Sequence, residues 1–173
     1  MANYYQYFVE GECEQKLIQE GKRPPWFLFK PGKVDVFNVV TKELSIARLL
    51  SIKKHTTIIL IYDIDKGNLN ILKSNITMLN KYGFTKILHV QSVKNFEEEI
   101  VYSSNLNNIN ELFCTVGASN FKQKFITHKN IISKLNNVGF DIDKIVNAAK
   151  GDYDISERMM LDVFLDGKMV GAA

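Results

Sequence analysis

The chain has 173 residues, of which 46% are hydrophobic and 24% are charged, and its formal net charge at pH 7 is +3. These values are ordinary for one globular domain with its own core, and they argue against a disordered or fibrous chain. Because no apolar run could span a bilayer, the polar start is no signal peptide, and Cys13 and Cys114 are too few for a disulfide framework, we expect a reduced, cytoplasmic protein with no membrane partner.

Strand and helix signals alternate along the first hundred residues. The strongest strand signal, TTIILIY, is apolar at successive positions, as expected for a central parallel strand covered on both faces. In chain order we expect a strand at Tyr4–Val9, a helix at Glu12–Glu20, a strand at Val34–Val40, a helix at Lys42–Ile52, a strand at Thr56–Tyr62, a helix at Asn68–Tyr82, a strand at Lys86–Gln91 and a helix at Glu97–Tyr102.

This order predicts an α/β fold with a parallel sheet of about four strands and helices on both faces. The pattern weakens after Ser103, where an Asn-rich loop, a short apolar run at Leu112–Val116 and helices at Lys129–Val138 and Asp143–Ala149 are expected. We therefore divide the chain into a core over 1–103 and a small C-terminal extension over 104–173, packed on the same domain. The apolar tail Ser156–Ala173 is expected to be a final packing element.

Acidic residues follow two of the predicted strands. Glu10 ends the first strand, with Glu14 on the next helix, and Asp63 and Asp65 follow the third strand. Because the carboxyl ends of parallel strands meet at one edge, these carboxylates would converge there and hold Mg²⁺ or Mn²⁺. Each group alone has a simpler explanation, since acids also complement a helix dipole and cap helices.

The motifs Val9-Glu10-Gly11, Glu14 and Asp63-Ile64-Asp65, in this β/α order, resemble the Toprim domain over roughly residues 4–103. The resemblance implies that Glu10 is a general acid/base beside the metal and that Asp63 and Asp65 are Mg²⁺ ligands. A stand-alone chain of this size is most similar to RloB-like or OLD-type nucleases, which implies a setting in phage defence and a possible ATPase partner protein.

Two further elements of the site are expected around this core. The segment Asn95–Glu99 resembles the acidic segment that such nucleases carry after the fourth strand, so Glu97 would join Glu14 at a second ion; an exposed helix start is the alternative. Lys122, or Lys124, would supply a cation for the developing charge in the transition state. A solvent-facing helix or turn is the simpler reading of both lysines.

Basic residues gather in two stretches of the chain. Lys16 to Lys54 is rich in Lys and Arg, and Ser119 to Lys134 contains four lysines and no acid. Basic surfaces attract phosphate backbones, although ordinary solvated lysines explain the charge equally well. The nucleic-acid-binding residues we expect are Lys53, Lys54, Lys124 and Lys129.

These expectations favour a metal-dependent nuclease that hydrolyses phosphodiester bonds of DNA or RNA. The alternatives are a non-cleaving Toprim-fold module that binds nucleic acid or a nucleotide beside an ATPase partner, and an unrelated α/β phosphotransferase acting on a small substrate. The sequence has no G-x-x-x-x-G-K-[ST] loop and no G-x-S-x-G motif, which argues against P-loop and serine-hydrolase chemistry. It does not indicate the oligomeric state.

Overall fold

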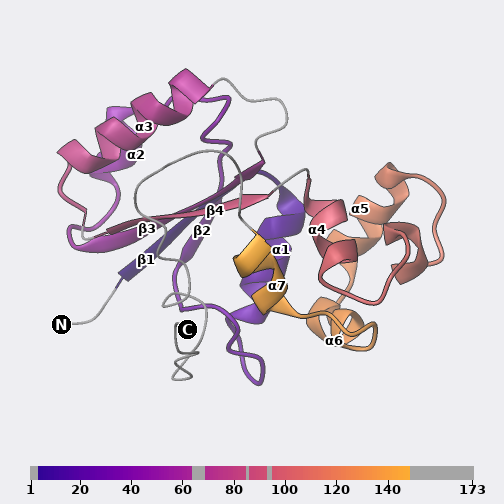
Figure 1. Ribbon diagram of the computed structural model, residues 1–173. Helices are drawn as coiled ribbons and strands as arrows, with labels where there is room; N and C mark the ends of the chain where they lie inside the picture. Colours follow the sequence, from indigo (N-terminus) through magenta and orange to yellow (C-terminus); the bar gives the residue numbers. More distant parts are fainter. Residues whose placement is uncertain (1–3, 64–68, 85, 93–94, 149–173) are drawn as a thin grey trace.

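The computed structural model describes residues 4–63, 69–84, 86–92 and 95–148, and it shows an α/β fold (Figure 1). Strands and helices alternate through the first hundred residues, and the elements described after them are helices joined by turns and loops. In chain order the elements are β1 (Tyr4–Val9), α1 (Glu12–Gly21), β2 (Lys33–Val36), α2 (Ile46–Leu50), β3 (Thr56–Asp63), α3 (Leu69–Lys81), β4 (Lys86–Ser92), α4 (Phe96–Tyr102), the 3-10 helix η1 (Ile109–Leu112), α5 (Ala118–Thr127), α6 (Ile131–Asn136) and α7 (Ile142–Ala148).

The described strands form one parallel sheet in the order β2-β1-β3-β4, which confirms the predicted fold class and is consistent with a Toprim-like fold. Val9, the last residue of β1, is in register with Ile61 of β3 and with Val36 of β2. The two inner strands, β1 and β3, therefore end almost level with each other. The residues that follow them must lie at the same edge of the sheet.

Both faces of the sheet are covered, and alternate side chains of the inner strands point to opposite faces. Tyr7, Val9 and Ile59 belong to the core under α1 and α4–α7, whereas Phe8 and Ile58 belong to the core under α2 and α3. Figure 1 shows α2 and α3 on one side of the sheet and the other helices on the opposite side. This arrangement explains why TTIILIY is apolar at successive positions.

The expected strand Val34–Val40 and helix Lys42–Ile52 are both too long. The chain leaves the sheet after β2, because the Asn38 side chain accepts hydrogen bonds from the backbone N–H groups of Val40 and Thr41 and closes a turn. Val39 and Val40 are buried in the α2/α3 core from this turn, so their apolar character reflects packing and not strand pairing. Ser45 then caps α2 by accepting from the Arg48 N–H at 3.2 Å.

The helices after α4 differ from the sequence prediction at α5. The chain-order prediction assigns no helix to α5, although a solvent-facing helix or turn is the simpler interpretation of its lysines. The apolar run at Leu112–Val116 belongs to η1 and the bend after it. Phe121 and Phe125 of α5 are fully buried and pack with Phe96 of α4 and Phe113. The Glu20 carboxylate of α1 accepts the Ile131 N–H of α6 at 2.7 Å, which ties α6 to the core. The final helices are close to their predicted ranges.

One prediction concerns residues outside the described part of the chain. The apolar tail Ser156–Ala173 lies beyond the described residues. Trp26, in the loop after α1, is partly buried against the core, as its apolar ring favours. None of the described helices combines the length and hydrophobicity that crossing a bilayer requires.

Candidate functional site

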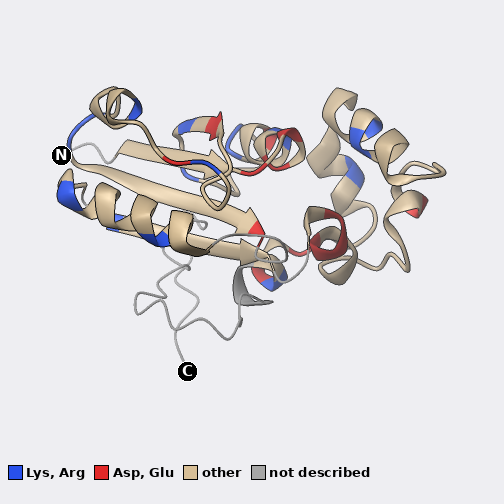
Figure 2. Cartoon of the chain, turned by 90° about the horizontal axis from the view of Figure 1, so that it is seen from above, with Lys and Arg blue, Asp and Glu red and all other residues tan. Residues whose placement is uncertain are grey.

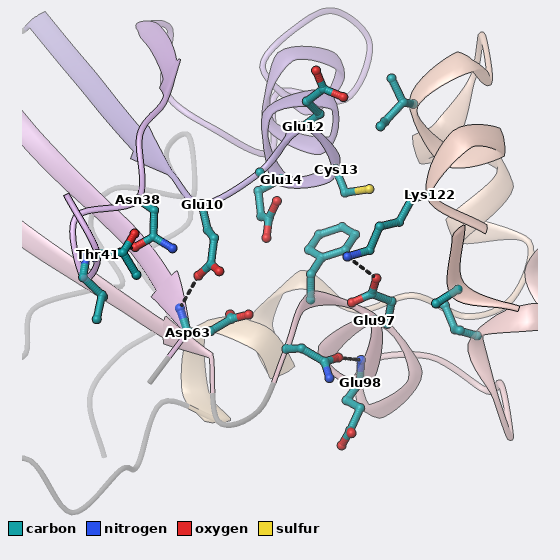
Figure 3. Close-up of a pocket in the computed structure, with 17 residues that line it drawn as sticks. Glu10, Glu12, Cys13, Glu14, Asn38, Thr41, Asp63, Glu97, Glu98 and Lys122 are labelled. Carbon is teal, nitrogen blue, oxygen red and sulfur yellow. Dashed lines mark hydrogen bonds and ion pairs between the residues drawn. The ribbon is translucent and has the colours of Figure 1, made fainter. Parts of the chain in front are cut away.

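A pocket of about 650 Å³ opens at the carboxyl ends of β1 and β3, between the sheet and the helices α1, α4 and α5 (Figure 3). Its wall carries several carboxylates, one ammonium group and a few apolar side chains. The residues that the argument uses are Glu10, Glu14, Asn38, Asp63, Glu97 and Lys122. The pocket therefore joins residues from five separated parts of the sequence.

Glu10 and Asp63 connect the ends of the two inner strands. The backbone N–H of Asp63 donates a hydrogen bond to Glu10 Oε2 at 3.1 Å. Figure 3 shows the carboxylates of both residues on the same side of the pocket. The predicted convergence of these two acids at one edge of the sheet is thus present in the structure.

Glu14 reaches the same pocket from the first turn of α1. Burial raises the pKa of the Glu14 carboxyl above its ordinary value, and the nearby Glu10 and Glu97 carboxylates raise it further. A Cβ atom on Gly11 would lie 3.1 Å from Glu14 Oε2, so glycine at this position lets the carboxylate fold back against the backbone. Glu12 is exposed and extends away from Glu14 (Figure 3).

Lys122 enters the pocket from α5 and pairs with Glu97 of α4. The Lys122 ammonium lies 3.1 Å from Glu97 Oε1, an oxygen that is buried and has no well-aligned hydrogen bond within the described part of the chain. The contact is an ion pair. The adjacent Glu97 carboxylate raises the pKa of Lys122, despite an opposing effect of burial, so the lysine is a stable cation.

Cys13, a residue of α1, points toward this ion pair and lines the same pocket (Figure 3). Burial raises the pKa of its thiol to about 12, and the charges of Glu14 and Glu97 act in the same direction. The thiolate form is the nucleophile in cysteine chemistry, and it is strongly disfavoured here. Cys13 is consequently a packing residue of the pocket wall.

Asn38 and Thr41 also line the pocket, and they are not among the site residues predicted from the sequence. Both belong to the turn after β2, and Figure 3 shows them on the Glu10 side of the pocket. Asn75 of α3 holds the continuation of this turn, because its side chain bonds to Leu44 N and to the carbonyls of Val39 and Lys42, each at 2.8 Å. Only the Asn itself could have indicated this turn, because Val39 and Val40 continue the apolar pattern of the strand.

The remaining predicted site residues are not part of the pocket wall. Asp65 lies outside the described residues. Lys53 and Lys54 precede β3, so they lie at the opposite edge of the sheet, and the Lys53 ammonium lies 4.4 Å from the centre of the Tyr4 ring. Lys124 and Lys129 are exposed on α5 and after it. The structure thus brings together Glu10, Glu14, Asp63, Glu97 and Lys122 but not the predicted nucleic-acid-binding lysines.

The donor set fits a cation that needs few protein ligands. Among the described residues, no group of three or more His, Cys, Asp or Glu side chains is placed to hold a metal ion. Mg²⁺ usually takes only one or two carboxylates and completes its octahedron with water and phosphate oxygens. Glu10 and Asp63 meet that requirement. Burial is the main cause of the raised pKa of Glu14, and the Glu10 and Glu97 carboxylates beside it add to the effect. Glu97 would have to leave Lys122 to bind a second ion.

Comparison of the chain with family models, with curated proteins and with solved structures gives no match.

Proposed function

We propose that the chain is a metal-dependent nuclease of the Toprim type, which hydrolyses phosphodiester bonds of DNA or RNA. The observation that carries this proposal is the convergence of Glu10 and Asp63, linked by the 3.1 Å hydrogen bond, in one pocket with the Lys122 cation. The resemblance of these residues and their neighbours to the Toprim motifs supports the same proposal. Mg²⁺ or Mn²⁺ would be held by Glu10 and Asp63, with Glu14 and Asp65 as additional candidate ligands.

The proposed chemistry divides between the two sides of the pocket. A bound divalent ion would neutralise charge on the scissile phosphate and lower the pKa of an attacking water. Glu10 is placed to accept a proton from that water, because its carboxylate extends into the pocket beside Asp63. Lys122 supplies a fixed positive charge on the opposite wall, where it can stabilise the developing negative charge of the transition state.

The choice of a polymeric phosphate substrate over a small phosphorylated one rests on the family resemblance, because a pocket of this size admits either. The pocket wall is formed by side chains from the sheet edge and from three helices, and the pocket holds about 650 Å³. We also propose that the chain acts on nucleic acid in phage defence, with or without an ATPase partner protein. Only the family resemblance supports this part of the proposal.

Cleavage assays on single-stranded DNA, plasmid DNA and RNA test the proposal directly. Wild-type protein should cut at least one substrate with Mg²⁺ or Mn²⁺ and none with EDTA, and Asp63→Asn should remove the activity. Glu43→Gln is the matched control, because Glu43 is exposed and lies outside the pocket wall. If Asp63→Asn cuts as fast as wild type, the proposal is wrong. Binding without cleavage by wild type would support the non-cleaving module instead.

A further inference from the structure

The two edges of the sheet carry opposite charge. At the carboxyl edge, the pocket wall contains Glu10, Glu14, Asp63 and Glu97, with Lys122 as the basic residue among them. At the amino edge, basic residues precede or begin the strands. Lys22 and Arg23 follow α1 there, and α3 ends there in Lys81. Figure 2 shows blue segments near the end where the strands begin, and red segments at the arrow tips and on α4.

We define the amino-edge surface by its exposed basic and aromatic residues, which come from four separate segments of the chain. In the described part of the chain, the basic members form no ion pair with a carboxylate. The nearby acids Glu20 and Asp35 are already paired, Glu20 with Lys16 and Asp35 with Lys33 and Arg48. The members of the surface are Tyr4, Arg23, Phe27, Lys53, Lys54 and Lys81.

Aromatic rings are exposed among these cations. Tyr4 is 44% exposed and Phe27 is 48% exposed, although burial is the usual fate of such large rings. Lys53 lies over the Tyr4 ring at 4.4 Å, which fixes a cation and an aromatic face side by side. A surface that needed only solubility would gain nothing from the exposed rings.

The amino-edge surface is separate from the pocket. With a rise of about 3.3 Å per residue, β3 places Thr56 roughly 23 Å from Asp63. This separation is about three times the Debye length of about 8 Å at physiological salt, so the acidic pocket does not cancel the positive potential of the amino edge. The two edges can therefore contact different parts of a charged partner.

We propose that the amino-edge surface binds single-stranded nucleic acid at a second site, distant from the pocket. Lysine and arginine side chains would neutralise backbone phosphates, and Tyr4 and Phe27 would stack on unpaired bases. A lipid surface supplies phosphates but no bases, and membrane binding at an interface commonly uses a longer amphipathic helix than α2, which spans Ile46–Leu50. The proposal requires no cleavage and holds whether or not the pocket is catalytic.

Fluorescence anisotropy with a labelled 20-nucleotide oligo-dT, in EDTA and at several NaCl concentrations, tests the second site without cleavage. Lys53→Glu/Lys54→Glu should weaken binding at least tenfold and lower the steepness of the log–log salt dependence by about 1.4, because each phosphate contact on a single strand contributes about 0.7. Lys73→Glu/Lys144→Glu changes the net charge equally on exposed positions elsewhere and should alter binding less than threefold.

A second variant separates stacking from charge. Tyr4→Leu/Phe27→Leu should weaken binding about fivefold or more while leaving the salt dependence unchanged, and circular dichroism should show a native fold for every variant. The proposal is overturned if wild type does not bind the oligonucleotide, or if both charge-reversed variants lose affinity equally. It is also overturned if Tyr4→Leu/Phe27→Leu binds like wild type, or if the Lys53/Lys54 variant loses binding to phosphatidylserine vesicles but not to oligo-dT.

Discussion

The backbone N–H of Asp63 donates a hydrogen bond to the Glu10 carboxylate at 3.1 Å, so the ends of the two inner strands are joined through the pocket's own acids. The bond occupies one carboxylate oxygen of Glu10 and orients the group. Glu10 consequently has a structural and a proposed chemical role, and the two can be separated by substitution.

Glu10→Gln should abolish cleavage without unfolding the protein. The glutamine side chain keeps an amide oxygen that can accept the Asp63 N–H, but it loses the charge for a cation and the basic site for a proton. We expect divalent-ion-dependent cleavage to fall by at least about 100-fold, as for the loss of a general base, while the melting temperature stays within a few degrees. An active Glu10→Gln variant would contradict the assigned role of Glu10.

Stability should depend on pH through Glu14. Because the folded-state pKa of Glu14 is raised above its ordinary value of 4.5, the native state holds this proton more tightly than the unfolded chain does. The resulting stabilisation is complete below the ordinary pKa and is lost as pH rises through the raised folded-state pKa. At neutral pH the ionised Glu14 is therefore a source of instability in metal-free protein.

Glu14→Gln should accordingly unfold at a higher urea concentration than wild type at pH 7 in EDTA, and this advantage should shrink or reverse near pH 4. Glu12→Gln is the matched control, because Glu12 lies in the same first turn of α1 but is exposed. Equal urea midpoints for wild type and Glu14→Gln at every pH would show that ionisation of the buried Glu14 carboxyl does not destabilise the fold.

Asn75 should be a major determinant of stability. Its side chain is fully buried and makes three hydrogen bonds, two as donor and one as acceptor, to the segment Val39–Leu44. Asn75→Ala would leave these buried backbone groups without partners, which we expect to lower the free energy of unfolding by about 2–4 kcal/mol in urea titrations. Asn80→Ala, on an exposed position of the same helix, should cost less than about 1 kcal/mol. Similar losses for both variants would refute this anchoring role.

The parts of the site that follow from a local sequence pattern could be predicted, and the parts that depend on tertiary contacts could not. Glu10 and Asp63 could be placed from sequence, because strand ends in a β/α alternation lie at one edge of a parallel sheet. The turn at Asn38 could not, since Val39 and Val40 continue the apolar pattern of β2 and are buried by tertiary contacts with Asn75 and the α2/α3 core.

The α5 helix also could not be predicted from local sequence, because tertiary packing fixes it. Its sequence, ASNFKQKFIT, has two buried aromatic residues four positions apart, a spacing too short to distinguish a helix from an apolar loop. The packing of Phe121 and Phe125 against Phe113 and Phe96 fixes the helix, and these contacts span some 30 residues of sequence. The pairing of Lys122 with Glu97 follows from that packing and carries no separate sequence signal.

The two cysteine thiols should differ sharply in reactivity. Cys13 is buried, and its thiol pKa is raised to about 12, whereas Cys114 is exposed. Iodoacetamide at pH 8 should modify Cys114 in the native protein within minutes and Cys13 only after unfolding in guanidinium, as peptide mass spectrometry can measure. Rapid native-state modification of Cys13 would show that the pocket wall opens beside α1.

The central claim is that Glu10 and Asp63 hold a divalent cation between the ends of β1 and β3. A crystal soaked in Mn²⁺ and measured at the manganese absorption edge tests this claim most directly. We predict an anomalous difference peak in direct contact with carboxylate oxygens of both Glu10 and Asp63, and its loss in Asp63→Asn crystals treated identically. A soaked crystal whose pocket has no anomalous peak, or whose Mn²⁺ binds only outside it, would contradict the account.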